Sequence, residues 1–311
     1  MYDAPAMEKA AALIKNFLNY VLAHDACPEY AANIMAARNI CDVAPREMRA
    51  THELLAGLPG AFNGAATALF CEPPEEGGVQ GRVRGADDLS NPENFDHWVA
   101  FRLTLLEAST NATARAKIAA LNPGDASALR AIDTREQEYE VRELRRPRAK
   151  YKKMLEAQLV AQGLGSDAVK PAGRVVLGPA IIAHGRHGVP RPDEAEVEAE
   201  LAARPGEEFL LEDELLAKLE PGMKLRLVTC GLALRSGGKQ EQEKEKEEDL
   251  GLRFIKEARD ARVSFDTFLP QSLMAHWRDP VANERPAPSV ANPRAEEKAT
   301  DALAGAGDLD D

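Results

Sequence analysis

The chain has 311 residues, of which 44% are hydrophobic and 29% are charged, as is usual for a soluble globular protein. It carries 39 Lys and Arg against 51 Asp and Glu, so its formal net charge of −12 opposes bulk binding to phosphate backbones or anionic lipid. A collagen-like chain, a general nucleic-acid binder and a membrane-spanning protein are therefore excluded, the last because no apolar run is long enough to cross a bilayer.

Residues 1–72 are predicted to form a helical N-terminal region. From Ala6 to Ala23 the apolar residues recur at a spacing of four, which indicates one broad helical stripe. A second apolar seam runs from Ile34 to Met48, and Pro45 is expected to kink or divide that helix because proline removes a backbone donor. A third, short helix is predicted from Ala61 to Phe70, between two turn signals.

The next region, residues 73–278, is predicted to be an α+β body with an antiparallel-rich sheet. Apolar and polar residues alternate in several short segments, which is the pattern of half-buried strands. These segments are Val99–Leu105, Val175–Leu177 with Ala180–Ala183, Met223–Thr229 and Leu250–Phe268. Because helices come first and strands later, we expect the α+β class.

Three further segments complete the organisation of the chain. A long polar helix is predicted over residues 128–162, with an interruption at Pro147. Residues 236–249 are acid-rich and hold few apolar side chains, so they are predicted to be a solvated insertion. Residues 279–311 carry four prolines and no aromatic residue, which predicts a disordered tail.

The four cysteines are spread along the chain without a C-x-x-C pair, which argues against a disulfide framework and a zinc ribbon. The first residues lack the basic end and apolar core of a signal peptide. We therefore expect a protein of the nucleus and cytoplasm.

No cofactor or metal site is expected. The glycines of Gly77–Gly81 lack the Lys-Ser/Thr pair of a phosphate-binding loop. His184 and His187 supply only two candidate metal ligands, with Arg186 between them, and an exposed turn is the favoured interpretation.

One enzymatic alternative remains open. His24, Asp25 and Cys27 lie close together in the sequence and could serve a small hydrolytic or thiol enzyme, with His184 or His187 contributed from the later sheet. The alternative interpretation is a helix end that locks into the core, and a catalytic trio would instead have to converge in an open cleft.

A compact basic cluster stands out against the acidic background. Its six cations are Arg145, Arg146, Arg148, Lys150, Lys152 and Lys153, with Tyr151 among them. They could meet nucleic-acid phosphates, act as a nuclear-import signal or dock on an acidic partner. Alternatively, they form a solvated helix face that pairs with nearby glutamates.

Acidic residues concentrate between Asp193 and Glu214. One hypothesis makes this stretch a docking face for a basic partner, because long-range attraction raises the rate and selectivity of association. The other interpretation is a surface that serves only solubility.

The most distinctive run of residues is Phe17–Tyr30, in which the polar and aromatic positions carry the information. These positions are Asn19, Tyr20, His24, Asp25, Cys27, Glu29 and Tyr30. The run resembles a segment of the argonaute-binding subunit of the fungal argonaute siRNA chaperone complex. Further similar blocks are Ala36–Asp42, Phe62–Phe70 and Val263–Gln271, so the resemblance spans about Ala12 to Gln271.

The resemblance implies a non-catalytic partner of argonaute that works with a second accessory subunit. Such a protein holds argonaute while argonaute carries duplex small RNA, restrains slicing and passenger-strand release, and supports heterochromatin silencing. On this basis we expect Asn19, Tyr20, His24, Asp25, Glu29 and Tyr30 to bind the partner. Contact with the duplex small RNA itself is expected to be indirect or weak, and the resemblance supplies no catalytic residue.

Overall fold

The computed structural model describes residues 3–71, 92–161, 169–182, 199, 201, 204–235 and 247–266. By its contacts the chain divides into two units, one of Met1–Gly185 with Val189–Leu269 and one of Arg186–Gly188 with Pro270–Asp311. The second unit lies outside the described residues, as does the predicted tail at 279–311.

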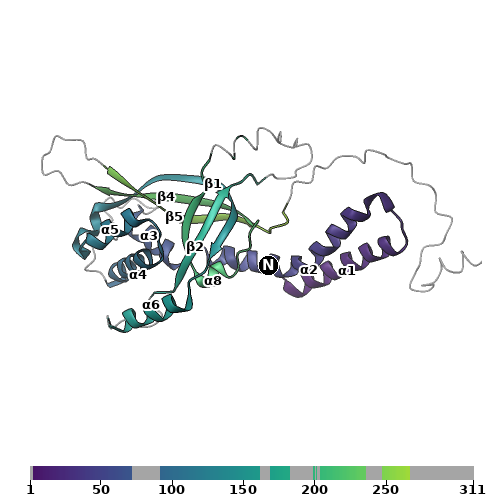
Figure 1. Cartoon of the computed structure of the whole chain (residues 1–311), viewed down its shortest axis with the longest axis horizontal. Helices are drawn as coiled ribbons and strands as arrows, with labels where there is room; N and C mark the ends of the chain where they lie inside the picture. Colours follow the sequence, from purple (N-terminus) through teal and green to yellow (C-terminus); the bar gives the residue numbers. More distant parts are fainter. Residues whose placement is uncertain are drawn as a thin grey trace, which may run out of the picture. The chain divides into compact units, whose positions relative to one another are not determined.

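The three helices predicted at the N-terminus are confirmed. Helix α1 (Ala4–Ala23) leads through a turn and the short 3-10 helix η1 (Pro28–Tyr30) into α2 (Ala31–Gly57), and α3 (Ala61–Phe70) follows (Figure 1). The division predicted at Pro45 is wrong, because α2 continues past it for three turns. The cost of an internal proline is offset there by packing, since Leu54 in those later turns is fully buried.

The strand predicted at Val99–Leu105 is wrong, because this segment lies within helix α4 (Pro92–Ala108). Trp98, Phe101 and Leu105 of α4 are buried at helical spacing in the main core. On another side of the helix, Ala100 and Leu103 pack against a second small cluster, formed with α6. Because apolar residues lie on two faces of α4, its sequence does not show the helical period. The alternation of apolar and polar residues that remains is typical of a strand.

The helix predicted over residues 128–162 is wrong in its first half. Helix α5 (Ala112–Ala120) and the 3-10 helix η3 (Pro123–Ala128) are followed by strand β1 (Leu129–Arg145), and only then by helix α6 (Ala149–Ala161). The charged residues of β1 favour a helix locally, but β1 is the central strand of the sheet, and pairing on both sides outweighs that weak preference. None of the described helices combines the length and hydropathy that crossing a bilayer requires.

Five antiparallel strands form one sheet in the order β3-β2-β1-β4-β5, which confirms the α+β class. Beside β1 these are β2 (Ala172–Pro179), β3 (Glu207–Glu212), β4 (Lys224–Arg235) and β5 (Glu247–Arg262), with the single-turn helix α8 (Asp213–Leu216) after β3. The strands predicted near Val175, Met223 and Leu250 are therefore confirmed, whereas Ala180–Ile182 follows the end of β2.

The insertion predicted at 236–249 is wrong at its end, because Glu247–Asp249 begin β5 and pair with β4. Ladder pairing gives these polar residues backbone partners that their composition does not reveal. The remainder of that segment, residues 236–246, lies outside the described residues.

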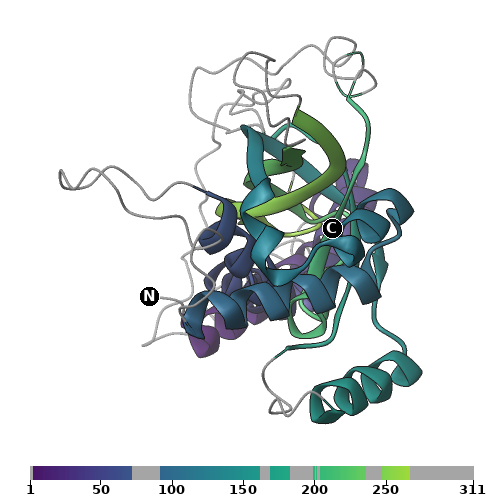
Figure 2. The same cartoon turned by 90° about the vertical axis from the view of Figure 1, so that its left-hand side faces the viewer.

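Alternate residues of the strands enter two different cores. Leu210 and Phe254 belong to a cluster with α3, α4 and α5, whereas Phe209 and Ile255 belong to a second cluster with the end of α2 and with α8. Both sheet faces are therefore covered, as period-two alternation requires. The strands also curl strongly (Figure 2).

The two edge strands, β3 and β5, are linked by one side chain. Asn63 of α3 is fully buried; its Nδ2 donates to the carbonyl oxygen of Leu210 at 3.0 Å, and its Oδ1 accepts from the Ile255 amide at 2.9 Å. The neighbouring Phe62 amide donates to the buried Glu212 carboxylate at 2.7 Å. Helix α3 thus provides partners for backbone groups that an open sheet edge would leave unpaired.

Candidate functional site

Helices α1 and α2 form an antiparallel hairpin, which we call the N-terminal hairpin (Ala4–Gly57). Three polar pairs join its helices: Asn19 with Arg38 (2.6 Å), Lys15 with Asp42, and Glu8 with Arg49 (2.9 Å). Along α1 the three polar residues, taken from Asn19 back to Glu8, are four and then seven residues apart. Their partners on α2, taken from Arg38 forward to Arg49, have the same spacings. Because these are helical spacings, one polar seam runs along the hairpin.

The remaining surface of this hairpin is unusually apolar. Seven of the ten large hydrophobic side chains that are exposed in the described residues belong to it: Leu13, Ile14, Phe17, Tyr20, Tyr30, Met35 and Ile40. Phe17 is 64% exposed and Leu13 is 60% exposed, and α1 has no buried residue at all. Exposed apolar side chains in this number on one element are typical of a site that binds another macromolecule.

The turn of the hairpin explains part of the distinctive sequence block. The Ala26 amide donates to the carbonyl oxygen of Val21 at 3.1 Å and the Asp25 amide to that of Leu22 at 3.3 Å, which is the pattern of a Schellman motif. Asp25 takes the left-handed position, with φ at 48°. Aspartate adopts this conformation more readily than most residues other than glycine, so a helix stop is encoded here.

The residues predicted to bind a partner all lie on this hairpin and are exposed, although they do not form one cluster. The rings of Tyr20 and His24 lie 4.2 Å apart at the end of α1, whereas Glu29 lies in η1 and Tyr30 caps α2. Asn19 instead accepts from Arg38 in the polar seam. Sequence reasoning missed Leu13, Ile14 and Phe17, because a helical stripe normally predicts burial.

His24, Asp25 and Cys27 occupy an exposed turn, and none of them lines the pockets described below. Among the described residues no group of three or more His, Cys, Asp or Glu side chains is placed to hold a metal ion. His184 and His187, the proposed contributors from the later sheet, lie outside the described residues.

The hairpin is attached to the sheet through the second half of α2. Glu47 of α2 is only 5% exposed, and its Oε2 accepts from the Ser264 amide at 3.0 Å and from the Ser264 hydroxyl at 2.8 Å. Leu54 enters the core that contains β5. Glu47 and Ser264 were not selected from the sequence as a pair, although Ser264 lies in one of the blocks that carry the family resemblance.

The basic cluster is not a single helix face, because it spans the end of β1, a turn and the start of α6. Asp213 holds two of its cations: Arg146 donates from Nε at 2.6 Å and from Nη2 at 2.9 Å, and Lys152 donates at 2.7 Å. The hydrogen bond from Arg146 and then that from Lys152 lower the pKa of Asp213 to about 2. Arg145 is bound by Glu143 through two nitrogens.

The acidic stretch predicted at Asp193–Glu214 is described only in part. From Glu207 onward its carboxylates bind partners within the chain, such as Arg135 to Glu207 at 2.8 Å and Lys170 to Glu214 at 3.1 Å. Residues 193–198 lie outside the described residues. In the described part these acids form ion pairs between strands and helices, while Glu214 stays largely exposed, so the docking face and the surface that serves solubility both remain predictions.

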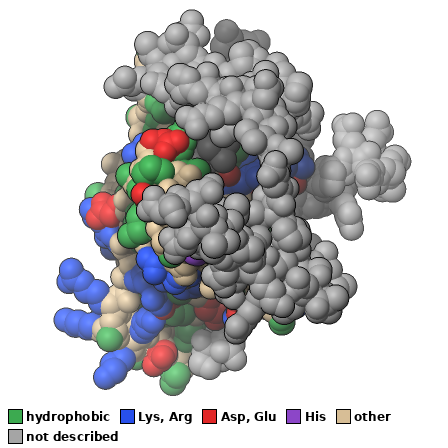
Figure 3. Space-filling model, turned by 90° about the vertical axis from the view of Figure 1, so that its right-hand side faces the viewer, with side chains coloured by type: hydrophobic (Ala, Val, Ile, Leu, Met, Phe, Trp, Pro, Cys, Tyr) green, Lys and Arg blue, Asp and Glu red, His purple; other side chains and the backbone are tan. Residues whose placement is uncertain are grey.

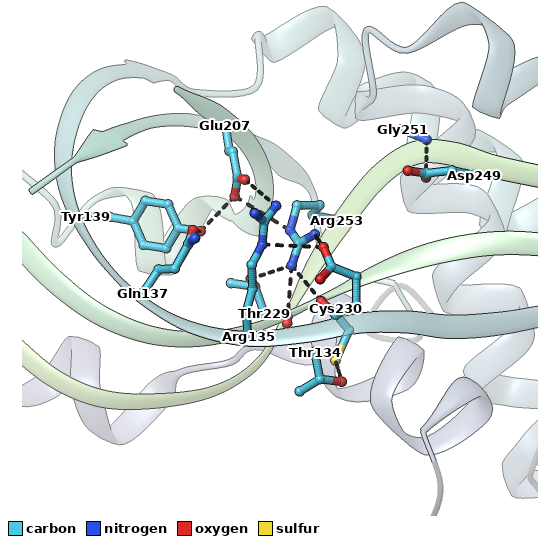
Figure 4. A network of polar contacts seen from close by, with 11 residues as sticks. Thr134, Arg135, Gln137, Tyr139, Glu207, Thr229, Cys230, Asp249, Gly251 and Arg253 are labelled. Carbon is cyan, nitrogen blue, oxygen red and sulfur yellow. Dashed lines mark hydrogen bonds and ion pairs between the residues drawn. The ribbon is translucent and has the colours of Figure 1, made fainter. Parts of the chain in front are cut away.

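A polar network lies where the sheet curls (Figure 4). Arg253 of β5 is 13% exposed; it binds the Asp133 carboxylate at 2.8 Å and the Thr229 hydroxyl at 2.9 Å, and its Nε lies 3.6 Å from Glu207. The Tyr139 hydroxyl donates to Glu207 at 2.7 Å. Burial, and then this bond, raises the pKa of Tyr139 above its usual value.

A pocket of about 440 Å³ opens beside this network. Its two arginines, Arg135 and Arg253, already have carboxylate partners, so the arrangement joins β1, β3, β4 and β5 rather than offering free charge. Another pocket, of about 390 Å³, lies near Glu138 and Arg226, which pair with each other at 2.6 Å.

An α+β body with exposed apolar side chains on a helical hairpin is typical of a subunit that binds other proteins. The family model for the Argonaute siRNA chaperone (ARC) complex subunit Arb1 matches residues 1–280, and the chain belongs to this family. The family connects the chain with small interfering RNA and with RNA interference. Neither the curated proteins nor the solved structures contain a match to the chain.

Proposed function

We propose that this protein is a non-catalytic subunit that binds argonaute through the apolar surface of the N-terminal hairpin. The observation that carries the proposal is the group of exposed hydrophobic side chains on a hairpin whose first helix has no buried residue. Membership of the Arb1 family supports argonaute as the partner, since the family is named for the argonaute siRNA chaperone complex.

The exposed surface is large enough to matter energetically. A phenylalanine side chain offers about 200 Å². Phe17, at 64% exposure, would therefore bury roughly 130 Å² in a complex, which corresponds to about 3 kcal/mol at 25 cal/mol per Å². Aromatic anchors of this kind commonly dominate an interface, whereas the polar residues around them set orientation. Phe17 is therefore the expected anchor, with Tyr20 one helical turn further along α1.

In the proposed role, the protein holds argonaute while argonaute carries duplex small RNA. It restrains slicing and passenger-strand release, and it acts with a second accessory subunit in small-RNA-directed heterochromatin silencing. This role would place it in the nucleus as well as the cytoplasm, and fractionation of cells that express the tagged chain tests that location. The attachment of α2 to Ser264 through Glu47 supports a restraining role, because it links the hairpin that would hold the partner to the body of the protein.

The test is retention of purified argonaute, loaded with duplex small RNA, by the tagged full-length chain. We expect Phe17→Glu to lower retention at least tenfold, because the charge would have to be buried in an apolar contact. Its matched control is Val160→Glu, since Val160 is 73% exposed on α6, away from the hairpin. Equal retention by the two variants would contradict the proposed surface.

The same pair of variants tests the effect on argonaute. Addition of the wild-type chain or of Val160→Glu should slow passenger-strand release from loaded argonaute, whereas Phe17→Glu should leave the rate close to that of argonaute alone. Retention without any effect on release would support binding and remove the restraining role.

A further inference from the structure

A second surface of the molecule is hollow and basic. A pocket of about 660 Å³ lies where the end of β1, the start of α6 and the start of β2 meet. The cations that line it are Arg145, Arg146, Arg148, Lys150 and Arg174. Arg174 is remote in sequence, so tertiary structure adds it to the basic cluster. We call this site the basic pocket. Figure 3 shows Lys and Arg side chains gathered at the lower left of the surface.

The charge of the basic pocket is only partly balanced. Among the described residues, seven cations (the six of the cluster and Arg174) face four carboxylates, those of Glu107, Glu143, Glu208 and Asp213. Arg148, Lys150 and Lys153 are exposed and form no ion pair with any residue that the structure describes. These three cations therefore remain available in or next to the pocket, in a chain whose net charge is −12.

The paired cations make the pocket a fixed surface. Asp213 is only 12% exposed, and it holds both Arg146 and Lys152 in place. A nuclear-import signal is a basic run that is read from the sequence, whereas this run is folded into a strand, a turn and a helix and tied to α8. The held pair gives the pocket a defined wall beside Arg148 and Lys150, whose side chains are exposed.

The pocket also has an apolar side that a simple anion would not use. Tyr151 and Met154 line it, and Met154 is 45% exposed. A volume of about 660 Å³ lies within the 300–1,000 Å³ usual for small-ligand sites. A phosphate flanked by cations, with a base or ribose against Met154, matches this combination of charge and apolar surface.

We propose that the basic pocket binds RNA, with one nucleotide phosphate on Arg148 and Lys150 and a neighbouring phosphate near Lys153. Guanidinium groups match phosphate geometry, and the acidic remainder of the chain confines RNA to this place. A peptide of acidic residues alone would use the charges but would gain little from Met154. The proposal does not rest on argonaute binding, because the pocket and the N-terminal hairpin share no residue.

The test uses the full-length chain and fluorescence anisotropy of a labelled small-RNA duplex, and of its single strand, at several salt concentrations. The variant R148A/K150A removes two exposed cations from the pocket, and K9A/R115A removes two exposed cations elsewhere, so the net charges match. The variant R148K/K150R keeps the charges. Urea midpoints of all variants should equal that of the wild type, because the replaced side chains are exposed.

We expect R148A/K150A to weaken RNA binding roughly tenfold and to reduce the slope of log affinity against log salt by about two, one for each lost phosphate contact. K9A/R115A and R148K/K150R should stay within about threefold of the wild type. Equal affinities for R148A/K150A and K9A/R115A would overturn the proposal. Tighter binding of polyglutamate than of RNA by the wild type would also overturn it and would assign the pocket to an acidic protein. Argonaute retention by R148A/K150A should be unchanged, which separates this outcome from that of the hairpin test.

Discussion

Asn63 provides the sharpest test of how the sheet is held together. Its side chain, fully buried, makes three hydrogen bonds, donating to the carbonyl oxygens of Pro59 (2.9 Å) and Leu210 (3.0 Å) and accepting from the Ile255 amide (2.9 Å). Leu210 lies on β3 and Ile255 on β5, the two edges of the sheet. The substitution Asn63→Ala therefore deprives both edges of a partner.

The expected cost follows from the groups left behind. A buried backbone donor or acceptor without a partner costs about 1–3 kcal/mol, and Asn63→Ala leaves at least the Leu210 carbonyl and the Ile255 amide in that state. We therefore expect a loss of about 3–5 kcal/mol in the free energy of unfolding. Because whole domains are stable by only about 5–15 kcal/mol, this is a large fraction of the total.

Urea unfolding followed by far-ultraviolet circular dichroism measures this loss, and amide exchange at Ile255 reports on the edge directly. Asn16→Ala is the matched control, since Asn16 is exposed on α1, and it should change stability by less than about 0.5 kcal/mol. The midpoint of Asn63→Ala should fall by roughly 1–2 M urea, with faster exchange at Ile255. A midpoint within error of Asn16→Ala would refute the claim that this side chain holds the two edges.

Two further predictions concern the contacts that fix the hairpin and the basic cluster. Glu47→Ala should lower the free energy of unfolding by about 2 kcal/mol, because the Ser264 amide loses its acceptor, whereas Glu47→Gln keeps an acceptor oxygen and should stay within about 0.5 kcal/mol of the wild type in the same urea assay. The pKa of Asp213 in the folded protein, about 2, lies below its ordinary value of 3.8. Its ion pairs therefore stabilise the fold fully at pH values above 3.8, and this stabilisation is lost as the pH falls through about 2. Asp213→Asn should thus be about 1 kcal/mol less stable at neutral pH, with the difference closing by about pH 2, and an equal difference at all pH values would contradict the assignment.

Whether an element could be predicted from the sequence depends on where that element packs. The α1 stripe and the Ala61–Phe70 helix could be predicted, because local turn signals and helical spacing coincide there. β1 could not be predicted, since its charged residues favour a helix and only its two neighbouring strands decide otherwise. Helix α4 was predicted as a strand, because burial on two of its faces removes the amphipathic period that normally identifies a helix.

The candidate surfaces show the same division. The hairpin turn and its distinctive residues were accessible to sequence reasoning, because Asp25 encodes a helix stop locally and the block resembles a known family. That Phe17 is exposed could not be read from the sequence, since the same stripe in a larger bundle would be buried. Arg174 joins the basic pocket only because β2 pairs with β1.

By itself the sequence determined the class of fold, the N-terminal helices, the acidic balance of −12 and the resemblance to the argonaute siRNA chaperone subunit. These properties depend on composition and on contacts within a few residues. Only the tertiary structure decided which apolar side chains face water, which acids neutralise which cations, and which cations remain free at the basic pocket. Burial and ion pairing are set by residues far apart in the chain, such as Arg146 and Asp213, and local pattern carries no record of them.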